Sequence, residues 1–268
     1  MVGVAQSVLF ELEDHTAVIT LNRPERGNAL GAEVAQGLID AWERVKSDPR
    51  IRVAIVTGAG ERHFCTGADV GGLESFGDRA EKAGSKTKYG YRDQIPYTPV
   101  VAEVWKPVIV AVNGVCAVGG FHFVVDSDII ICSDNATFLD PHVSVGQVAA
   151  LEPIGLSRRI PLEAILRMNL VGRWERMSAE RAFQIGLVGE VVPQEQLLPR
   201  AKEIAAMIAK NSPAAVRATK RAIWNSLEHG LHEGLAQGWE ILMEHWDHPD
   251  QKEGPAAFGE KREPEWQD

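Results

Sequence analysis

The stretch KPVIVAVNGVCAVGGFH, residues 106–122, decides the fold of this chain. It begins as a short apolar run, passes through a pair of glycines and continues into an apolar, helix-like segment. The runs VAIVTG (53–58) and DIIIC (128–132) flank it and have the same character. Short, continuously apolar runs are typical of strands buried on both faces of a parallel sheet. Strands that alternate with helices in this way predict parallel βαβ units and an α/β protein.

The remaining chain fits this class. Residues 8–13 and 16–21 predict the two strands of a hairpin. Ser178 is a candidate N-cap of a later helix, and residues 197–245 predict two or three amphipathic helices. This mostly helical final part fits either a small second domain or an oligomer interface. A further helix is predicted to end at SDPR (47–50), and the members of its apolar stripe are Val34, Leu38, Ala41, Trp42 and Val45.

Residues 74–99 have a different composition: they are charged, glycine-punctuated and weakly periodic. They fit a mobile surface segment near a binding site, and they fit equally a solvated loop with a short helix. Both interpretations stay open at this point.

The composition excludes several classes of protein. The chain has 268 residues, a net charge of −9 and 45% hydrophobic residues, as in an ordinary globular protein. Its acidic balance argues against a nucleic-acid binder. The cysteines, Cys65, Cys116 and Cys132, lack metal-ligand spacing, which favours buried thiols in a reducing compartment. No apolar run approaches the ~18 residues of a membrane span, and no export signal precedes residue 20, so we expect a soluble, cytoplasmic protein.

Two loops of small residues are candidates for chemistry. HFCTGADVGGL (63–73) follows one buried strand, and NGVCAVGGFH (113–122) follows another. Where a strand leads through small residues into a helix, backbone N–H groups point outward and the helix N-terminus favours an anion. Two such loops on adjacent strands can converge on one oxygen and form an oxyanion hole. Alternatively, the glycines only permit tight strand-to-helix turns.

A set of motifs, in order along nearly the whole chain, resembles the crotonase superfamily of enoyl-CoA hydratases, isomerases and relatives. The motifs are LNRPERGNAL, FCTGADV, KPVIVAVNG with the following GG, SDIIICSDNATF, ERMSAERAFQIGLVGEVVP and FGEKREPEW. The resemblance implies a spiral of repeated ββα units over residues 1–195 and a helical C-terminal region, residues 196–268, for oligomerisation and active-site closure. It also implies an acyl-CoA thioester substrate, no resident cofactor, and a homotrimer or a dimer of trimers.

The resemblance also assigns roles to individual residues. Ala68 and Gly119 match the two family positions whose backbone amides polarise the thioester carbonyl and stabilise the enolate. The positions that match contacts to the CoA phosphates and adenine are Arg23, Arg26, Phe258 and Lys261; the two arginines also fit plain solvated loop charge. Local positive charge in an acidic protein suits a ligand that carries phosphates.

The chain departs from the family at both catalytic carboxylates. The hydratases have Glu three residues after the second oxyanion glycine, where this chain has His122. Their second Glu matches His142, fourteen residues after Asp128. Imidazole suits general base work near neutral pH because its ordinary pKa is about 6.5. Each histidine alone also fits a hydrogen-bonded core residue; both together at these positions predict a water-activating site.

Nearby acids could assist the histidines. Glu152 and Asp140 can each accept the second N–H of an imidazole, as a carboxylate does in catalytic triads. We prefer Glu152, because Asp140 in LDP also fits a simple turn. A metal site is disfavoured because the two histidines lack a paired third ligand.

Four functions remain open at this level. The enzyme could hydrate a 2-enoyl thioester, or shift its double bond with Glu152 as acid and base. It could instead resemble the retro-Claisen branch of the superfamily, in which histidine-activated water cleaves a carbon–carbon bond in a β-dicarbonyl compound. A silent member that binds acyl-CoA or a partner without turnover is the alternative outside enzyme chemistry.

Overall fold

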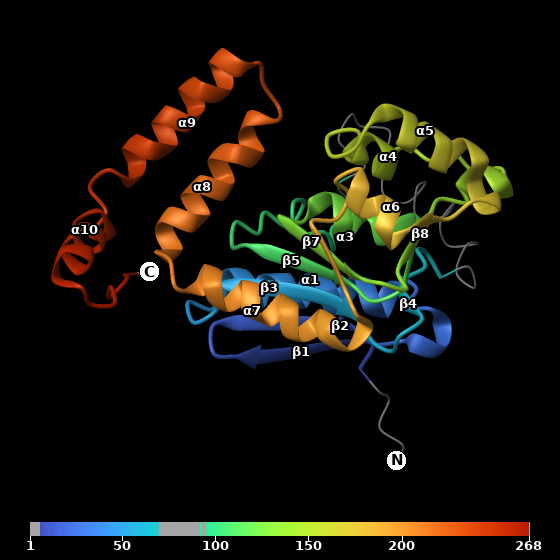
Figure 1. The fold of residues 1–268 in the computed structure, drawn as a ribbon, viewed down its shortest axis with the longest axis horizontal. Helices are drawn as coiled ribbons and strands as arrows, with labels where there is room; N and C mark the ends of the chain where they lie inside the picture. The colour runs from blue at the N-terminus through green and yellow to red at the C-terminus, as the bar shows by residue number, and fades with distance from the viewer. Residues whose placement is uncertain (1–5, 70–91, 93–94, 268) are drawn as a thin grey trace.

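The computed structural model describes residues 6–69, 92 and 95–267, and two sheets form its centre (Figure 1). The first sheet has the strand order β1-β2-β3-β5-β7-β10, and the second has the order β4-β6-β8-β9. The strands of the first are β1 (Val8–Glu13), β2 (Thr16–Leu21), β3 (Val53–Gly58), β5 (Val108–Val112), β7 (Ile129–Ser133) and β10 (Glu190–Val192). Those of the second are β4 (His63–Cys65), β6 (Val115–Ala117), β8 (Thr137–Leu139) and β9 (Met177–Ser178).

The chain alternates between the two sheets. β3, β5 and β7 of the first sheet lead directly into β4, β6 and β8 of the second. Neighbours from β2 to β10 in the first sheet are parallel, and only β1 runs antiparallel to its neighbour. The predicted α/β class with repeated ββα units is therefore confirmed, and so is the hairpin at the start.

Helices bury the first sheet on both faces. α1 (Ala32–Ser47) and α3 (Phe121–Asp126) contribute to the larger apolar core on one face. α7 (Leu197–Ala209) covers the other face, where its buried side chains contact Ile55, Ile109 and Ala111. β3 and β5 are buried at every residue, which explains their continuously apolar sequences.

The remaining helices lie at the two ends of the molecule (Figure 1). The predicted cap is confirmed, because the Ser178 hydroxyl accepts a hydrogen bond from the backbone N–H of Arg181. The helices are α4 (Leu151–Leu156), α5 (Leu162–Val171), α6 (Ala179–Gln184), α8 (Pro213–Ser226), α9 (Leu231–His245) and α10 (Asp250–Glu260). The 3₁₀ turns are η1 (Pro24–Arg26), η4 (Val118–Gly120), η5 (His142–Val145), η6 (Gly172–Trp174) and η7 (Gln194–Gln196).

The sequence did not predict α10. Its interior contains Gly254 and Pro255, which are poor helix formers, and this obscures the helical pattern. Residues 74–99, left open above, fall almost wholly outside the described residues. In the part of the chain that is described, no helix is long and apolar enough to cross a membrane.

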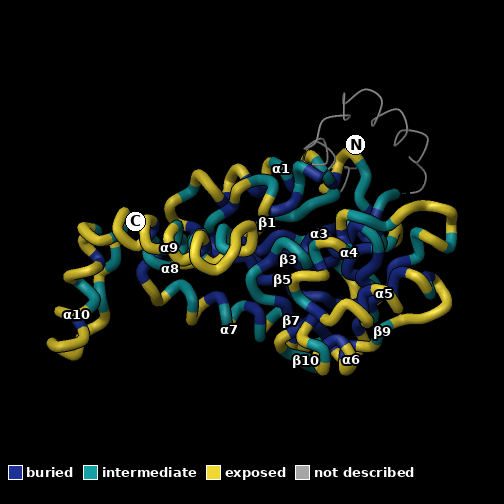
Figure 2. Tube along the Cα trace, turned by 90° about the horizontal axis from the view of Figure 1, so that it is seen from above, coloured by how far each residue is buried: buried dark blue, intermediate teal, exposed yellow. Residues whose placement is uncertain are grey.

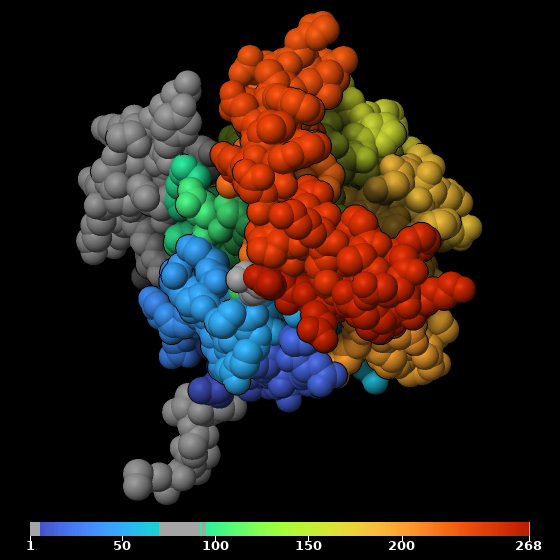
Figure 3. Space-filling view, turned by 90° about the vertical axis from the view of Figure 1, so that its left-hand side faces the viewer, coloured from blue at the N-terminus to red at the C-terminus, as the bar shows by residue number. Residues whose placement is uncertain are grey.

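α8 and α9 form a hairpin that projects from one end of the molecule (Figure 1). Figure 3 looks onto this end, with the orange and red C-terminal helices in front. Most of α9 is exposed, whereas β3 and β5 are buried throughout (Figure 2). α7, which precedes the hairpin, packs directly on the first sheet. The division into regions 1–195 and 196–268 stays a prediction.

Asp128 anchors this hairpin to the sheet. Its carboxylate accepts hydrogen bonds from the Val108 backbone N–H and the Trp224 indole N–H, both at 2.7 Å. The Lys220 ammonium lies 2.7 Å from the same carboxylate and also donates to the Lys106 carbonyl. Burial lowers the pKa of Lys220, although Asp128 opposes that effect. A buried charge held in this way fixes where the middle and last turn of α8 lie relative to β5 and β7.

We expect Lys220→Met to lower the free energy of unfolding by about 3 kcal/mol, because it leaves the Asp128 carboxylate without its buried counter-charge. Urea denaturation measures this loss. Lys202→Met is the matched control, since Lys202 pairs with Glu13 at an exposed site and such a pair contributes about 1 kcal/mol or less. Equal losses in the two variants would contradict the anchoring role of Asp128.

Candidate active site

Two loops converge because they leave neighbouring parallel strands. β4 and β6 pair in parallel, so their carboxyl ends lie at one edge of the second sheet. The Gly67–Ala68 loop follows β4, and Val118–Gly119 follows β6. A Cβ atom placed on Gly119 would lie 3.5 Å from the Gly67 Cα and 3.9 Å from the Ala68 nitrogen. The two amides singled out in the sequence are therefore side by side.

This close approach requires glycine. Gly67 has a φ of +88°, and a Cβ there would lie 2.4 Å from the Val118 Cβ. A Cβ on Gly120 would lie 2.7 Å from the Cys65 carbonyl oxygen. Side chains at either position would push the loops apart. The glycines thus let the two loops pack backbone against backbone.

Val118 carries backbone strain beside these amides. Its φ is +53°, a left-handed conformation that a β-branched residue rarely adopts. Strain of this kind persists where the surrounding packing imposes it, and it concentrates at functional sites. Outside the helices and strands, no backbone carbonyl of a described residue accepts a hydrogen bond from the Ala68 or Gly119 N–H.

His122 lies on α3, one turn beyond Gly119, and pairs with Glu152 of α4. Its Nε2 is 3.2 Å from Glu152 Oε1, and both side chains are less than a tenth exposed. Burial raises the pKa of Glu152, but the hydrogen bond and charge of His122, with a contribution from His142, outweigh burial and leave that pKa lowered. The Glu152 side chain is therefore a carboxylate at neutral pH.

His142 pairs with a different acid, Asp140. Its Nδ1 lies 2.7 Å from Asp140 Oδ1, and its backbone N–H donates to the same oxygen at 3.0 Å. The hydrogen bond to Asp140 raises the pKa of His142, and the charges of Asp140 and Glu152 add to this effect while partial burial opposes it. Glu152 thus influences both histidines electrostatically.

The two arginines lie beside the first loop and share a partner. Arg23 Nη1 is 3.1 Å from Asp69 Oδ2, and Arg26 Nη2 is 3.6 Å from Asp69 Oδ1. Asp69 follows Ala68 directly, so the positive charge is tied to the loop that carries the amide. Sequence reasoning missed Asp69; its position in TGAD, next to Ala68, was the available signal.

Phe258 and Lys261 are not brought to this site within one chain. Both belong to the end of α10, and Phe258 is 88% exposed. Figure 1 places α10 at the opposite end of the molecule from β4 and α4. In the described ranges, no group of three or more His, Cys, Asp or Glu side chains is arranged to hold a metal ion.

Comparisons with known proteins agree on one family. The family model described as enoyl-CoA hydratase/isomerase matches residues 11–268. The chain is 38% identical to (E)-benzylidenesuccinyl-CoA hydratase of Thauera aromatica, over 96% of this chain and 97% of that protein. It is 34% identical to carnitinyl-CoA dehydratase of Proteus mirabilis, over 98% of this chain and 99% of that protein. The crystal structure of an enoyl-CoA hydratase/isomerase from Mycobacterium paratuberculosis superposes with a TM-score of 0.86 at 41% identity, covering 97% and 98% of the two chains.

We expect Gly67→Ala to lower the free energy of unfolding by roughly 3 kcal/mol, because it adds a steric clash with Val118 to the cost of a left-handed alanine. Gly186→Ala is the matched control. Gly186 has a φ of +80° but no atom within 4 Å of an added Cβ, so it should lose only about 1 kcal/mol. Urea denaturation distinguishes the two, and losses of equal size would mean that the loops can separate without cost.

Proposed function

The chain belongs to the enoyl-CoA hydratase/isomerase family, the crotonase superfamily, and has its fold; from this premise we propose that it adds water to, or removes it from, a 2-enoyl-CoA thioester through an enolate. The observation that carries the proposal is the approach of the Gly67–Ala68 and Val118–Gly119 loops, with His122 one turn away. His122 and His142 stand, in this proposal, where the hydratases have their catalytic glutamates.

The Ala68 and Gly119 amides are proposed to hold the thioester oxygen. They donate to the carbonyl in the substrate and more strongly to the enolate oxygen, which carries the negative charge. One such preorganised donor contributes on the order of 10²–10³ in rate. The strained Val118 supports this role, because it fixes the direction of the Gly119 N–H before substrate binds.

In the hydration direction, His142 Nε2 is proposed to take a proton from water as the oxygen bonds to the β-carbon. The double bond's electrons move to the thioester oxygen and form the enolate. The His122–Glu152 pair then delivers a proton to the α-carbon, which yields the 3-hydroxyacyl thioester. The proton that His142 has taken returns to the His122–Glu152 pair through solvent before the next turnover. Dehydration is the same path reversed.

We expect His142→Gln and His122→Gln each to lower kcat by about 10²–10⁴, the usual contribution of a general acid or base. Loss of the enoyl-thioester ultraviolet absorbance measures turnover. The substrates are a short 2-enoyl-CoA and, guided by the relatives, (E)-benzylidenesuccinyl-CoA; carnitinyl-CoA tests the dehydration direction. His15→Gln, at the exposed β1–β2 turn, is the control and should keep wild-type activity. Full activity in both site variants would refute the assignment.

A retro-Claisen hydrolase is the second candidate, and the Asp140–His142 pair favours it. An imidazole held by a carboxylate is an arrangement that activates water for attack on a carbonyl. The same preparation is therefore incubated with cyclic 3-oxoacyl-CoA thioesters. A product heavier by one water, without loss of enoyl absorbance in the other assays, would identify carbon–carbon cleavage. Tight binding of acyl-CoA with no turnover of either substrate class would favour a binding protein.

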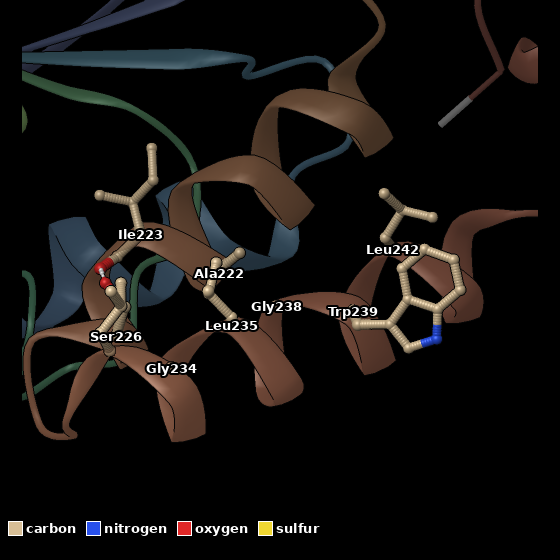
Figure 4. A pocket seen from close by; sticks show the side chains of 9 residues that line it. Ala222, Ile223, Ser226, Gly234, Leu235, Gly238, Trp239 and Leu242 are labelled. Atoms are coloured by element: carbon tan, nitrogen blue, oxygen red, sulfur yellow. Dashed lines mark hydrogen bonds between the residues drawn. The ribbon is translucent and has the colours of Figure 1, made fainter.

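CoA is proposed to bind along Arg23 and Arg26, with Phe258 and Lys261 supplied by another copy. The position of α10, which carries Phe258, at the opposite end of the molecule from β4 supports a homotrimer or a dimer of trimers. So does the apolar surface of the α8–α9 hairpin, where Leu235 and Trp239 are more than 60% exposed. A groove of about 410 Å³ between the two helices is lined by both residues (Figure 4).

We expect the double variant Leu235→Glu, Trp239→Glu to dissociate the oligomer, because charge on an apolar interface opposes its burial. Sedimentation velocity should then show one third or less of the wild-type mass. Circular dichroism checks that the helix content is unchanged. An unaltered mass with both substitutions in place would exclude this face as the interface.

A further inference from the structure

We infer that Asp140 is a positioning residue that sets both the tautomer and the charge of His142. The inference rests on the proposed role of His142 as the group that takes a proton from water. The sequence left open which acid assists which histidine, and the arrangement of Asp140 differs from that of Glu152 in a way that assigns them separate tasks.

The buried Asp140 side chain is a hydrogen-bond acceptor for His142. Its residue is 1% exposed, and one oxygen, Oδ1, accepts both the backbone N–H and the ring Nδ1–H of His142. It directly follows β8, and Pro141 separates it from His142. The strand and the proline therefore hold the carboxylate and the imidazole in a fixed relation.

This contact decides which ring nitrogen reacts. An ionised carboxylate accepts hydrogen bonds and cannot donate, so Nδ1 must carry the proton. In the neutral ring Nε2 then has the free lone pair that a base needs. His122 is held the other way, since its Nε2 faces Glu152. The two imidazoles thus present different nitrogens, and only His142 offers Nε2.

The charge of Asp140 matters as well as its geometry. An asparagine at position 140 could accept the same backbone N–H of His142 with its side-chain oxygen. The carboxylate adds a negative charge beside the ring, which stabilises the imidazolium formed when water is deprotonated. Two elements that pack against η5 carry charged residues: η6 carries Arg173, and α5 carries Glu163 and Arg167. The charges that raise the pKa of His142 are those of Asp140 and Glu152.

Asp140→Asn keeps an acceptor for the His142 backbone N–H, but it removes the charge and no longer forces the ring proton onto Nδ1, because an amide can donate as well as accept. We expect the plateau of kcat/KM to fall roughly 10- to 100-fold. Asp140 raises the pKa of His142, so its loss lets the imidazole stay neutral at lower pH. The acidic limb of the kcat/KM profile should therefore move to lower pH. KM should change little, and Asp140→Asn should cause no further loss in a His142→Gln background.

Asp48→Asn is the matched control. Asp48, Pro49 and Arg50 form the same Asp-Pro-X turn, in which Asp48 Oδ1 accepts the Arg50 backbone N–H at 3.0 Å. This turn follows α1 and has no histidine, so its substitution should leave the pH profile unchanged. An equal shift in the Asp48→Asn profile would attribute the effect to net charge and overturn the inference.

Nitrogen NMR of His142, assigned by difference from His142→Gln, tests the inference without turnover. In the wild type the neutral ring should carry its proton on Nδ1, and Asp140→Asn should lower its pKa and mix the tautomers. An unchanged titration and tautomer in Asp140→Asn would overturn the positioning role. If His142→Gln keeps full activity, the proposed function of His142 fails, yet this titration still decides what Asp140 does.

Discussion

The candidate site depends on one constraint: the loop after β4 and the loop after β6 must pack backbone against backbone. Two amide groups can face one oxygen only if nothing larger than hydrogen lies between the chains. Gly67 and Gly120 satisfy this condition, since a Cβ at either would collide with Val118 or the Cys65 carbonyl. The parallel pairing of β4 with β6 brings the two loops to the same edge. The donors are thereby oriented by the core rather than by the ligand.

The same packing sets the electrostatics of His122 and Glu152, the proposed acid–base pair. α3 and α4 lie so close that a Cβ on Gly155 would be 2.2 Å from a Val125 methyl. This contact keeps Glu152 within reach of His122, where burial would otherwise favour the neutral acid. Each of the two imidazoles is thereby paired with one carboxylate. A single carboxylate in an apolar pocket would instead tend to stay protonated.

Much of the fold could be predicted from periodicity and turn chemistry. The hairpin, the helix of residues 32–47, the parallel buried strands and the Ser178 cap all depend on local patterns, and all are present. α10 was missed because Gly254 and Pro255 weaken its helical signal while tertiary contacts still form it. Among these contacts, Asp250 accepts from the Ser212 hydroxyl and from the Gln267 backbone N–H.

The sequence by itself determined the family and the two glycine loops, because strand burial and glycine placement leave local patterns; the roles of the two histidines stay predictions. Only the tertiary structure decided the pairing of acids with imidazoles. Asp140 is two residues from His142, whereas Glu152 reaches His122 across two helices. Our preference for Glu152 as the orienting acid therefore captured one pair and not the other. Spacing along a chain does not give distance between helices, which depends on how closely their side chains allow them to pack.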